Sequence, residues 1–166
     1  MWFWRLTKAS RPTFDGEGAR LFGGRWSHPG VALVYTAESL ALAVLEFFVH
    51  LSAQDPPDLA AIRAEIPEEL KILRVDPSAL PADWRHMPAP APLAELGTKW
   101  VRGAATAVLA VPSAIVPRET NYLLNPAHPE FGRIKIDRPE PFSLDPRMLG
   151  RRPVSRGPAR PRRAPR

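Results

Sequence analysis

Apolar residues change their spacing along the chain, from short runs to a helical repeat and back. Short apolar runs rich in β-branched and aromatic residues predict strands. Such runs occupy residues 2–6, 31–35, 59–66, 71–75, 106–111 and 134–137. Between the second and third runs, Leu40, Ala43, Val44, Phe47 and Leu51 recur at helical spacing. This repeat predicts a buried helix over residues 39–52.

The remaining segments complete a mixed pattern. A second helix is predicted over residues 93–103, and helical turns over 80–86, 121–126 and 145–149. Residues 8–30 contain five glycines and two prolines, which predicts a long loop. Strands and helices do not alternate in the regular way of a parallel βαβ sheet. We therefore predict one α+β domain, with short strands in mixed sheets and a central helix near residues 39–52.

Positive charge is concentrated at one end of the chain. The net charge of the sequence is +6, and residues 151–166 hold seven arginines and no acidic residue. Subtracting those seven from +6 leaves −1 for residues 1–150. We predict a folded domain over 1–150 and a disordered basic tail over 151–166, because the tail has too few apolar groups to fold. No aromatic residue interleaves its arginines to stack on bases, which favours a solvated end over nucleic-acid binding.

Composition excludes several classes of site. The chain has no cysteine, which excludes disulfides and thiolate metal sites. Its four histidines show no paired spacing, so we expect no metal. The N-terminus lacks the layout of a signal peptide. The longest apolar stretch, about residues 40–51, is shorter than the ~20 residues that a membrane helix needs. We expect a cytoplasmic protein without membrane association.

One carboxylate, Glu46, interrupts the apolar run of the predicted central helix. Such a group either faces solvent or is buried and held by a partner. Ser39 and His50 lie on the same helical stripe, so the three residues could form the exposed face. The spacing leaves both interpretations open.

Other residues have side chains suited to phosphate and sugar. In Gly23-Gly24-Arg25, the glycines allow backbone N–H groups to approach an anion, and a guanidinium matches phosphate geometry. Taken alone the motif is more typical of a tight turn with an exposed arginine, and it matches no dinucleotide fingerprint or P-loop. Arg5 is either a second phosphate ligand or a surface charge. Tyr35 could bind a ribose or fill the core, and Ser113 could bind a ligand or cap a turn.

The joint order of these residues resembles the RES domain, a family named for its arginine, glutamate and serine. The motifs that carry the resemblance are Trp4-Arg5-Leu6, Gly18-Ala19, Gly23-Gly24-Arg25-Trp26, Val34-Tyr35-Thr36-Ala37, Ser39, Glu46, Val111-Pro112-Ser113, Asn121-Tyr122-Leu123-Leu124-Asn125-Pro126 and His128-Pro129-Glu130-Phe131. They span roughly residues 2–145. One departure is Ser27, where many members carry asparagine.

The resemblance implies a fold similar to that of ADP-ribosyltransferase toxins, and metal-free chemistry on NAD⁺ as substrate. RES toxins cleave NAD⁺ at the nicotinamide–ribose bond, as glycohydrolases or phosphorylases that deplete cellular NAD. By matching position, Arg25, Glu46 and Ser113 are the expected catalytic residues, and Arg5, Arg25, Tyr35 and Ser113 are expected to bind NAD⁺.

The same resemblance implies a partner, an Xre-type antitoxin that covers the active site, and leaves the acceptor open. One alternative is a mono-ADP-ribosyltransferase that modifies a protein target. A more remote one is a non-catalytic module that binds nucleic acid through the basic tail over 151–166.

Overall fold

The computed structural model describes residues 1–51 and 57–149. The strands are β1 (Trp2–Lys8), β2 (Val34–Ala37), β3 (Leu59–Glu65), β4 (Ile72–Arg74), β5 (Val108–Pro112), β6 (Thr120–Leu124), β7 (Lys135–Ile136) and β8 (Glu140–Phe142). The helices are α1 (Glu17–Phe22), α2 (Leu40–Phe48) and α3 (Ala91–Gly103), with short 3-10 turns η1 (Pro77–Ala79), η2 (Pro129–Arg133) and η3 (Pro146–Leu149). The predicted tail over 151–166 lies outside the described residues.

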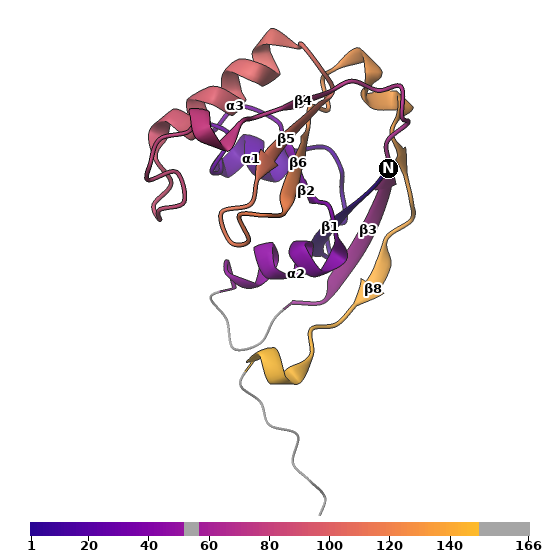
Figure 1. The fold of residues 1–166 in the computed structure, drawn as a ribbon. Coiled ribbons are helices and arrows are strands. Elements are labelled where there is room, and N and C mark those ends of the chain that lie inside the picture. Colours follow the sequence, from indigo (N-terminus) through magenta and orange to yellow (C-terminus); the bar gives the residue numbers. More distant parts are fainter. Residues whose placement is uncertain (52–56, 150–166) are drawn as a thin grey trace, which may run out of the picture.

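All eight of these strands belong to one twisted sheet (Figure 1). Its order is β4-β5-β6-β2-β1-β3-β7. β7 pairs with residues 64–65 of β3, and β8 pairs with residues 59–61 of the same strand. The β4–β5 pair is parallel and the other pairs are antiparallel. The longest pairing joins β1 to β3 from Trp2↔Glu65 to Lys8↔Leu59. The predicted α+β class, with a mixed sheet and a central helix, is confirmed.

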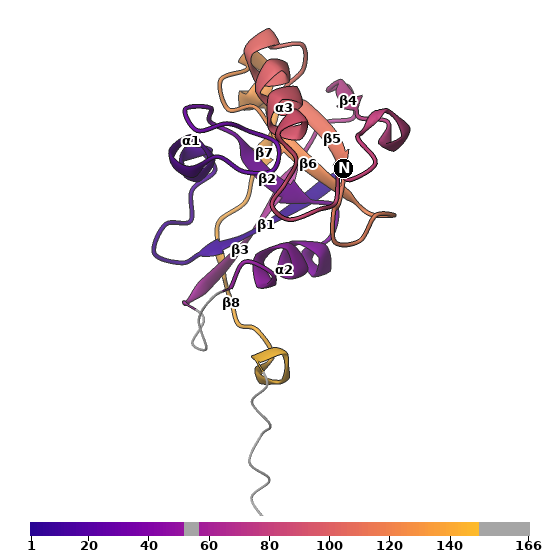
Figure 2. The same ribbon diagram turned by 90° about the vertical axis from the view of Figure 1, so that its left-hand side faces the viewer.

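Two apolar clusters attach the longer helices to the sheet. The cluster between α3 and strands β5 and β6 includes Trp26, Leu33, Leu93, Trp100, Leu109, Val111 and Leu123. The cluster between α2 and strands β1, β2 and β3 includes Leu6, Ala37, Leu42, Ala43, Leu59 and Ala61. Figure 2 shows α3 and α2 one above the other in front of the strands.

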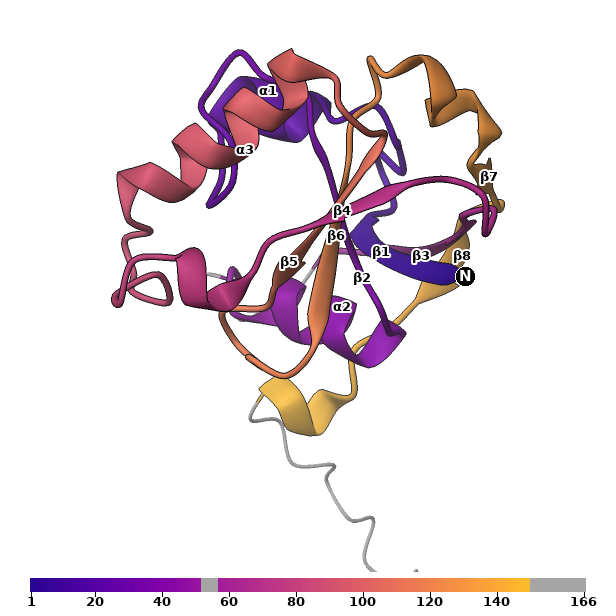
Figure 3. The same ribbon diagram turned by 45° about the horizontal axis from the view of Figure 1, so that its top comes forward.

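Strand register shows that both helices cover the same face of the sheet. Tyr35 pairs with Leu123, and Ala37 pairs with Asn121. Alternate residues of a strand share a face, so these four side chains point the same way. Leu123 belongs to the α3 cluster and Ala37 to the α2 cluster. Tyr35 and Asn121 therefore lie in the gap between the two helices, which Figure 3 shows from another side.

The opposite face of the sheet carries a third buried cluster. Its members include Phe3, Val34, Ala64, Val108, Ala110, Tyr122 and Leu124. The rings of Phe3 and Tyr122 stack with centroids 3.9 Å apart. With apolar side chains on both faces, β5 and β6 form a rigid support for residues at their ends.

The predicted helical turn over 121–126 is wrong, because β6 occupies Thr120–Leu124. Residues 122–124 are buried on both faces of the sheet, so they form a continuous apolar run without the alternation that indicates a strand. The backbone N–H of Asn125 then donates to the Ala107 carbonyl, which continues the pairing with the chain beside β5. Pairing with β2 and β5, rather than the local sequence pattern, determines β6.

Other boundaries moved by smaller amounts. The predicted loop over 8–30 contains α1, whose first turn is held by a bond from the Glu17 N–H to the Asp15 carboxylate. The strand predicted over 31–35 begins at Val34, where pairing with β6 begins. The turn expected over 80–86 consists of hydrogen-bonded turns, and the nearest 3-10 helix is η1. In the described ranges, no helix combines the length and the apolar character that a membrane crossing requires.

Candidate functional site

A cavity of about 760 Å³ opens on the helix-bearing face of the sheet. Its walls come from β1, the 23–26 segment, β2, α2, the 85–89 segment, the 114–115 turn and β6. This volume suits a small-molecule or cofactor-sized ligand. Among the lining residues, Arg5, Arg25 and Arg85 are cationic and Glu46 is the one carboxylate. The lining therefore favours an anionic ligand. The protein also places one negative charge of its own, that of Glu46, at a defined position against that ligand.

Glu46 is half-buried and held by two donors on one oxygen. Ser113 Oγ donates to Glu46 Oε1 at 2.8 Å, and Asn121 Nδ2 donates to the same atom at 2.5 Å. Neither bond uses Oε2. Ser39 instead accepts from the Leu42 N–H at the start of α2. The structure thus decides between the two interpretations: Glu46 is a partnered carboxylate in the cavity wall.

Ser113 lies behind Glu46 rather than in the cavity. Its side chain is fully buried, and it is not among the lining residues. Its Oγ also accepts from the N–H groups of Ile115 and Val116, at 3.1 and 3.0 Å, which caps the turn after β5. Ser113 therefore influences the cavity through its hydrogen bond to Glu46. A direct contact between Ser113 and a substrate stays a prediction.

Tyr35 connects two walls of the cavity. Its Oη accepts from the Trp26 N–H at 3.1 Å and shares a hydrogen bond with Ser27 Oγ at 3.2 Å. Burial raises the pKa of the Tyr35 phenol, although the bonds from Ser27 and Trp26 oppose this. A Cβ on Gly24 would lie 2.6 Å from Tyr35 Oη, so only glycine allows this approach. The glycine pair thus makes room for the tyrosine.

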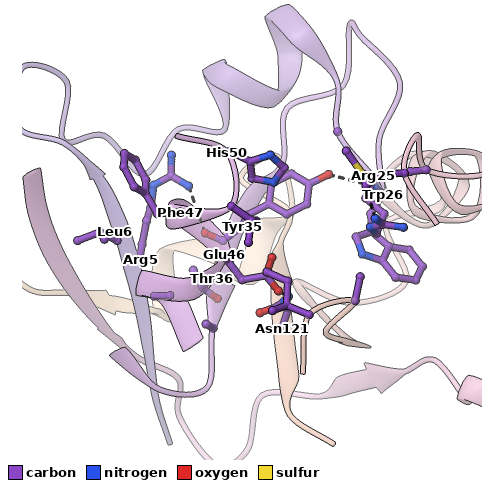
Figure 4. Close-up of a pocket in the computed structure, with 18 of the residues that line it drawn as sticks. Arg5, Leu6, Arg25, Trp26, Tyr35, Thr36, Glu46, Phe47, His50 and Asn121 are labelled. Carbon is purple, nitrogen blue, oxygen red and sulfur yellow. Dashed lines mark hydrogen bonds between the residues drawn. The ribbon is translucent and has the colours of Figure 1, made fainter. Parts of the chain in front are cut away.

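Arg5 lies on the other side of Tyr35 from Arg25 (Figure 4). Its Nη1 donates to the Tyr35 carbonyl at 3.1 Å. Burial lowers the pKa of the Arg5 guanidinium from its ordinary value, and Asp15 opposes this shift. Arg5 Nε is buried without a partner among the described residues. A buried donor of this kind is uncommon in proteins.

Arg25 is bound to the wall of the cavity by its guanidinium. Its Nη1 donates to the Trp84 carbonyl at 2.6 Å, and its Nη2 donates to the His86 carbonyl at 3.2 Å and contacts Met87 Sδ at 3.3 Å. Burial lowers the pKa of Arg25, and the negative charge of Glu46 opposes this. Arg25 is therefore a half-buried bridge between two segments rather than an exposed charge in a turn.

The model of the family described as the RES domain matches residues 3–145. The chain belongs to the RES domain family. It is 40% identical over 154 residues to the "Prs ADP-ribosylating toxin" of Sphingobium sp. (strain YBL2), covering 89% of this chain and 96% of that protein. It is 41% identical over 140 residues to a "Toxin Res" of Yersinia enterocolitica, covering 82% of this chain and 90% of that protein.

A solved structure shows the same fold for this RES domain. It is described as the crystal structure of the M. tuberculosis MbcT–MbcA toxin–antitoxin complex. The matched chain superposes with a TM-score of 0.72 at 19% identity, covering 90% of this chain and 86% of that chain. The predicted family membership and fold are both confirmed.

Two lining residues of this RES domain were missed by the sequence interpretation. Asn121, which holds Glu46, fell inside the predicted helical turn. Reading Thr120–Leu124 as a strand would have placed Asn121 on the same face as Leu123 and toward the site. Arg85 lies in a proline-rich segment whose pattern carries no periodic signal. Its Nε donates to the Ala114 carbonyl at 3.0 Å.

Metal ligands are not grouped in the part of the RES domain that the structure describes. Within residues 1–51 and 57–149, no three histidine, aspartate or glutamate side chains are placed to hold an ion together. The polar groups around the cavity are guanidinium, carboxylate, amide and hydroxyl groups and the imidazole of His50. Such a set is suited to phosphate and sugar groups.

Proposed function

We propose that this RES domain is the toxin of a toxin–antitoxin pair and cleaves NAD⁺ at the bond between nicotinamide and ribose. One observation carries the proposal: a single carboxylate, Glu46, is held in the cavity wall by two donors, with guanidinium groups on either side of it. The relatives named as toxins support the biological role.

The chemistry requires stabilised positive charge more than proton transfer. When the C1′–N bond breaks, its electron pair leaves with the pyridine nitrogen, and nicotinamide departs neutral. The ribose carbon then carries oxocarbenium character, as in glycoside cleavage. A fixed carboxylate beside that carbon stabilises the developing charge. We assign this role to Glu46, while the acceptor oxygen bonds to C1′ and its proton passes to water.

The rest of the cavity suits the remainder of NAD⁺. Arg5 and Arg25 would hold the pyrophosphate, since guanidinium groups bind phosphate oxygens in charge-assisted pairs. Tyr35 would pack against the nicotinamide or its ribose. Ser113 would act through its hydrogen bond to Glu46.

Transfer of ADP-ribose to a protein is the second candidate. It is favoured by the 40% identity to a relative named for ADP-ribosylation. The bond that breaks is the same in both reactions, and only the acceptor differs. Water or phosphate would make the RES domain a glycohydrolase or a phosphorylase, whereas a protein side chain would make it an ADP-ribosyltransferase.

An antitoxin that covers the cavity is the partner we propose, of Xre type by the family resemblance. The structural neighbour is described as a toxin–antitoxin complex. Apolar side chains are exposed around the opening here: Met87 at 72% and Val49 at 55% line the cavity, and Phe22 at 83% precedes the lining residue Gly23. Exposed apolar groups at one opening are typical of a surface that a protein covers. We propose that the protein acts in the cytoplasm, where it would meet both NAD⁺ and such a partner.

Release of nicotinamide from NAD⁺ tests the enzymatic proposal. Glu46→Gln should reduce release by about 100-fold or more, because the charge is lost. The fold should persist, since the glutamine carbonyl can still accept from Ser113 and Asn121. Glu68→Gln, an exposed residue outside the cavity, is the matched control. No release by folded protein, even with phosphate and cell extract present, would overturn the proposal.

The products separate the acceptors. Free ADP-ribose identifies water, and ADP-ribose carrying an additional phosphate identifies phosphate. Label transferred from NAD⁺ to a protein band in lysate identifies a protein acceptor.

A further inference from the structure

The segment over residues 84–89 forms one wall of the cavity but lies outside the sheet. Arg85, Met87, Pro88 and Ala89 line the cavity. The backbone bonds near the segment are local turns, from Trp84 N–H to Pro81 and from His86 N–H to Asp83. These turns shape the segment without tying it to the strands. Its position against the cavity therefore depends on side chains: Trp84 packs against the α3 cluster, and one further attachment comes from elsewhere in the chain.

Arg25 supplies that attachment on both sides of Arg85. The Trp84 carbonyl accepts from one terminal nitrogen of Arg25, and the His86 carbonyl accepts from the other. These two carbonyls flank residue 85 in the chain. A planar guanidinium fork that binds both fixes the backbone direction between them. Arg25 thus helps to fix the backbone position from which the Arg85 side chain extends.

Arg85 is placed to use its charge in the cavity. Its Nε donates to the Ala114 carbonyl at 3.0 Å, which directs the side chain across to the turn that follows β5. That bond leaves both terminal nitrogens for another acceptor. Ala114 lines the cavity beside it. The exposed Arg85 can therefore meet an anion without giving up its own anchor.

We propose that Arg85 is an additional anion-binding residue of this cavity, and that Arg25 is the positioning residue that places it. The inference rests on the proposed function for the identity of the anion, the pyrophosphate of NAD⁺. Arg25 has five N–H groups, and two of them, one on each terminal nitrogen, already donate to carbonyls. Arg85 then adds both of its terminal nitrogens to the phosphate contact made by Arg5 and Arg25.

A binding cycle tests the assignment without relying on catalysis. The variants are Arg25→Ala, Arg85→Ala and the double variant, with Arg102→Ala as a control for an exposed arginine of α3 outside the cavity. The probe is inorganic pyrophosphate, with its Kd measured by calorimetry. NAD⁺ is measured in parallel on the Glu46→Gln background. Pyrophosphate binding remains a valid readout even if the protein does not cleave NAD⁺.

We expect Arg85→Ala to raise the Kd by about tenfold, as for loss of one charge-assisted contact. Arg25→Ala should raise it at least as much, and the double variant should bind no more weakly than Arg25→Ala. Amide hydrogen exchange over residues 84–89 should accelerate in Arg25→Ala and not in Arg102→Ala. Should Arg25→Ala fail to fold, Arg25→Lys keeps the charge but lacks the fork, and it should accelerate the same exchange.

Two results would overturn the proposal. In the first, Arg85→Ala binds pyrophosphate as tightly as Arg102→Ala, which removes Arg85 from the anion site. In the second, the losses from Arg25→Ala and Arg85→Ala multiply while exchange over 84–89 is unchanged. Arg25 would then act only through its own contact with the anion and would not position Arg85.

Discussion

Ser113 Oγ donates a 2.8 Å hydrogen bond to Oε1 of Glu46, although 67 positions separate the two residues in the sequence. Ser113 is fully buried at the end of β5, and Glu46 projects from α2 into the cavity wall. Asn121 donates to the same oxygen from β6. Ser113 and Glu46, which the family resemblance predicts to be catalytic, are thus one structural unit, with Asn121 as its third member.

We expect Ser113→Ala and Asn121→Ala each to lower the kcat of NAD⁺ cleavage roughly tenfold, since each removes a hydrogen bond to a charged group. Either remaining donor can still orient Glu46 Oε1. The double variant should therefore lose more than the product of the single losses. The KM should change less than kcat for Ser113→Ala, because Ser113 does not line the cavity. Steady-state kinetics of nicotinamide release measure both constants.

Thr106→Val is the control for loss of a buried hydroxyl. Thr106 Oγ1 accepts from Trp100 Nε1 and donates to the Val108 carbonyl, away from the cavity. Its loss should lower stability by about 1–3 kcal/mol while kcat is retained. If Ser113→Ala behaved in the same way, Ser113 would be only a turn cap.

The sequence indicated two residues of the unit, Glu46 and Ser113, but not the contacts between them. Helical spacing predicted the buried face of α2, and the observed helix, Leu40–Phe48, lies within the predicted range. Spacing within one helix is silent on partners that come from other strands, so the environment of Glu46 stayed open. The resemblance to the RES domain predicted that Glu46 and Ser113 are functional. Their mutual bond required the fold.

Two features of the site were beyond pattern reasoning for a physical reason. Asn121 directly precedes residues 122–124, which are buried on both faces of the sheet, so the period-two signal of a strand is absent. Arg25 meets the carbonyls of Trp84 and His86, which belong to an irregular segment about 60 residues away. Backbone carbonyls are present at every position, so no residue type marks them as partners.

Gly24→Ala should reduce both NAD⁺ cleavage and stability. The added Cβ would meet Tyr35 Oη at 2.6 Å and Cζ at 3.1 Å, so the tyrosine must move from the Trp26 N–H. Overpacking of this kind costs about 1–3 kcal/mol. Thermal unfolding and nicotinamide release measure the two effects.

Gly18→Ala is the matched control for Gly24→Ala. Gly18 lies in α1, where an added Cβ has no neighbour within 4 Å among the described residues. This variant should be neutral or gain up to about 1 kcal/mol from helix propensity. Equal behaviour of the two alanine variants would contradict a steric role for Gly24.

Gly97→Ala should destabilise the protein although Gly97 lies outside the cavity. A Cβ at this position of α3 would overlap the backbone carbonyl of Trp26, so helix and segment must separate. We expect a loss of about 2 kcal/mol or more in the free energy of unfolding. NAD⁺ cleavage should also fall, because Trp26 follows Arg25 directly. Gly103→Ala is the control. Gly103 ends the same helix, and an added Cβ there has no neighbour within 4 Å among the described residues. This variant should lower stability and NAD⁺ cleavage much less than Gly97→Ala does.

The stability conferred by Tyr35 should decline at alkaline pH. Burial raises the pKa of Tyr35, so the folded state retains the phenolic proton at a pH where the unfolded state releases it. The unfolded state then binds fewer protons, and the free energy of unfolding falls as pH rises. The contribution is complete below the ordinary tyrosine pKa of about 10 and is lost as pH rises toward the raised value.

Tyr35→Phe isolates this term. At neutral pH the variant should be less stable by about 1–3 kcal/mol, because the Trp26 N–H loses its acceptor. The difference in unfolding free energy between wild type and variant should shrink as pH increases above about 10. The other titrating groups are common to both proteins, so their contributions cancel in this difference. The sequence has two tyrosines, so the difference between the absorbance titrations of the two folded proteins reports Tyr35 alone. A phenol that titrates at its ordinary value in that difference would show that Tyr35 is not held as described, and the coupling between β2 and the Gly24–Trp26 segment would fail with it.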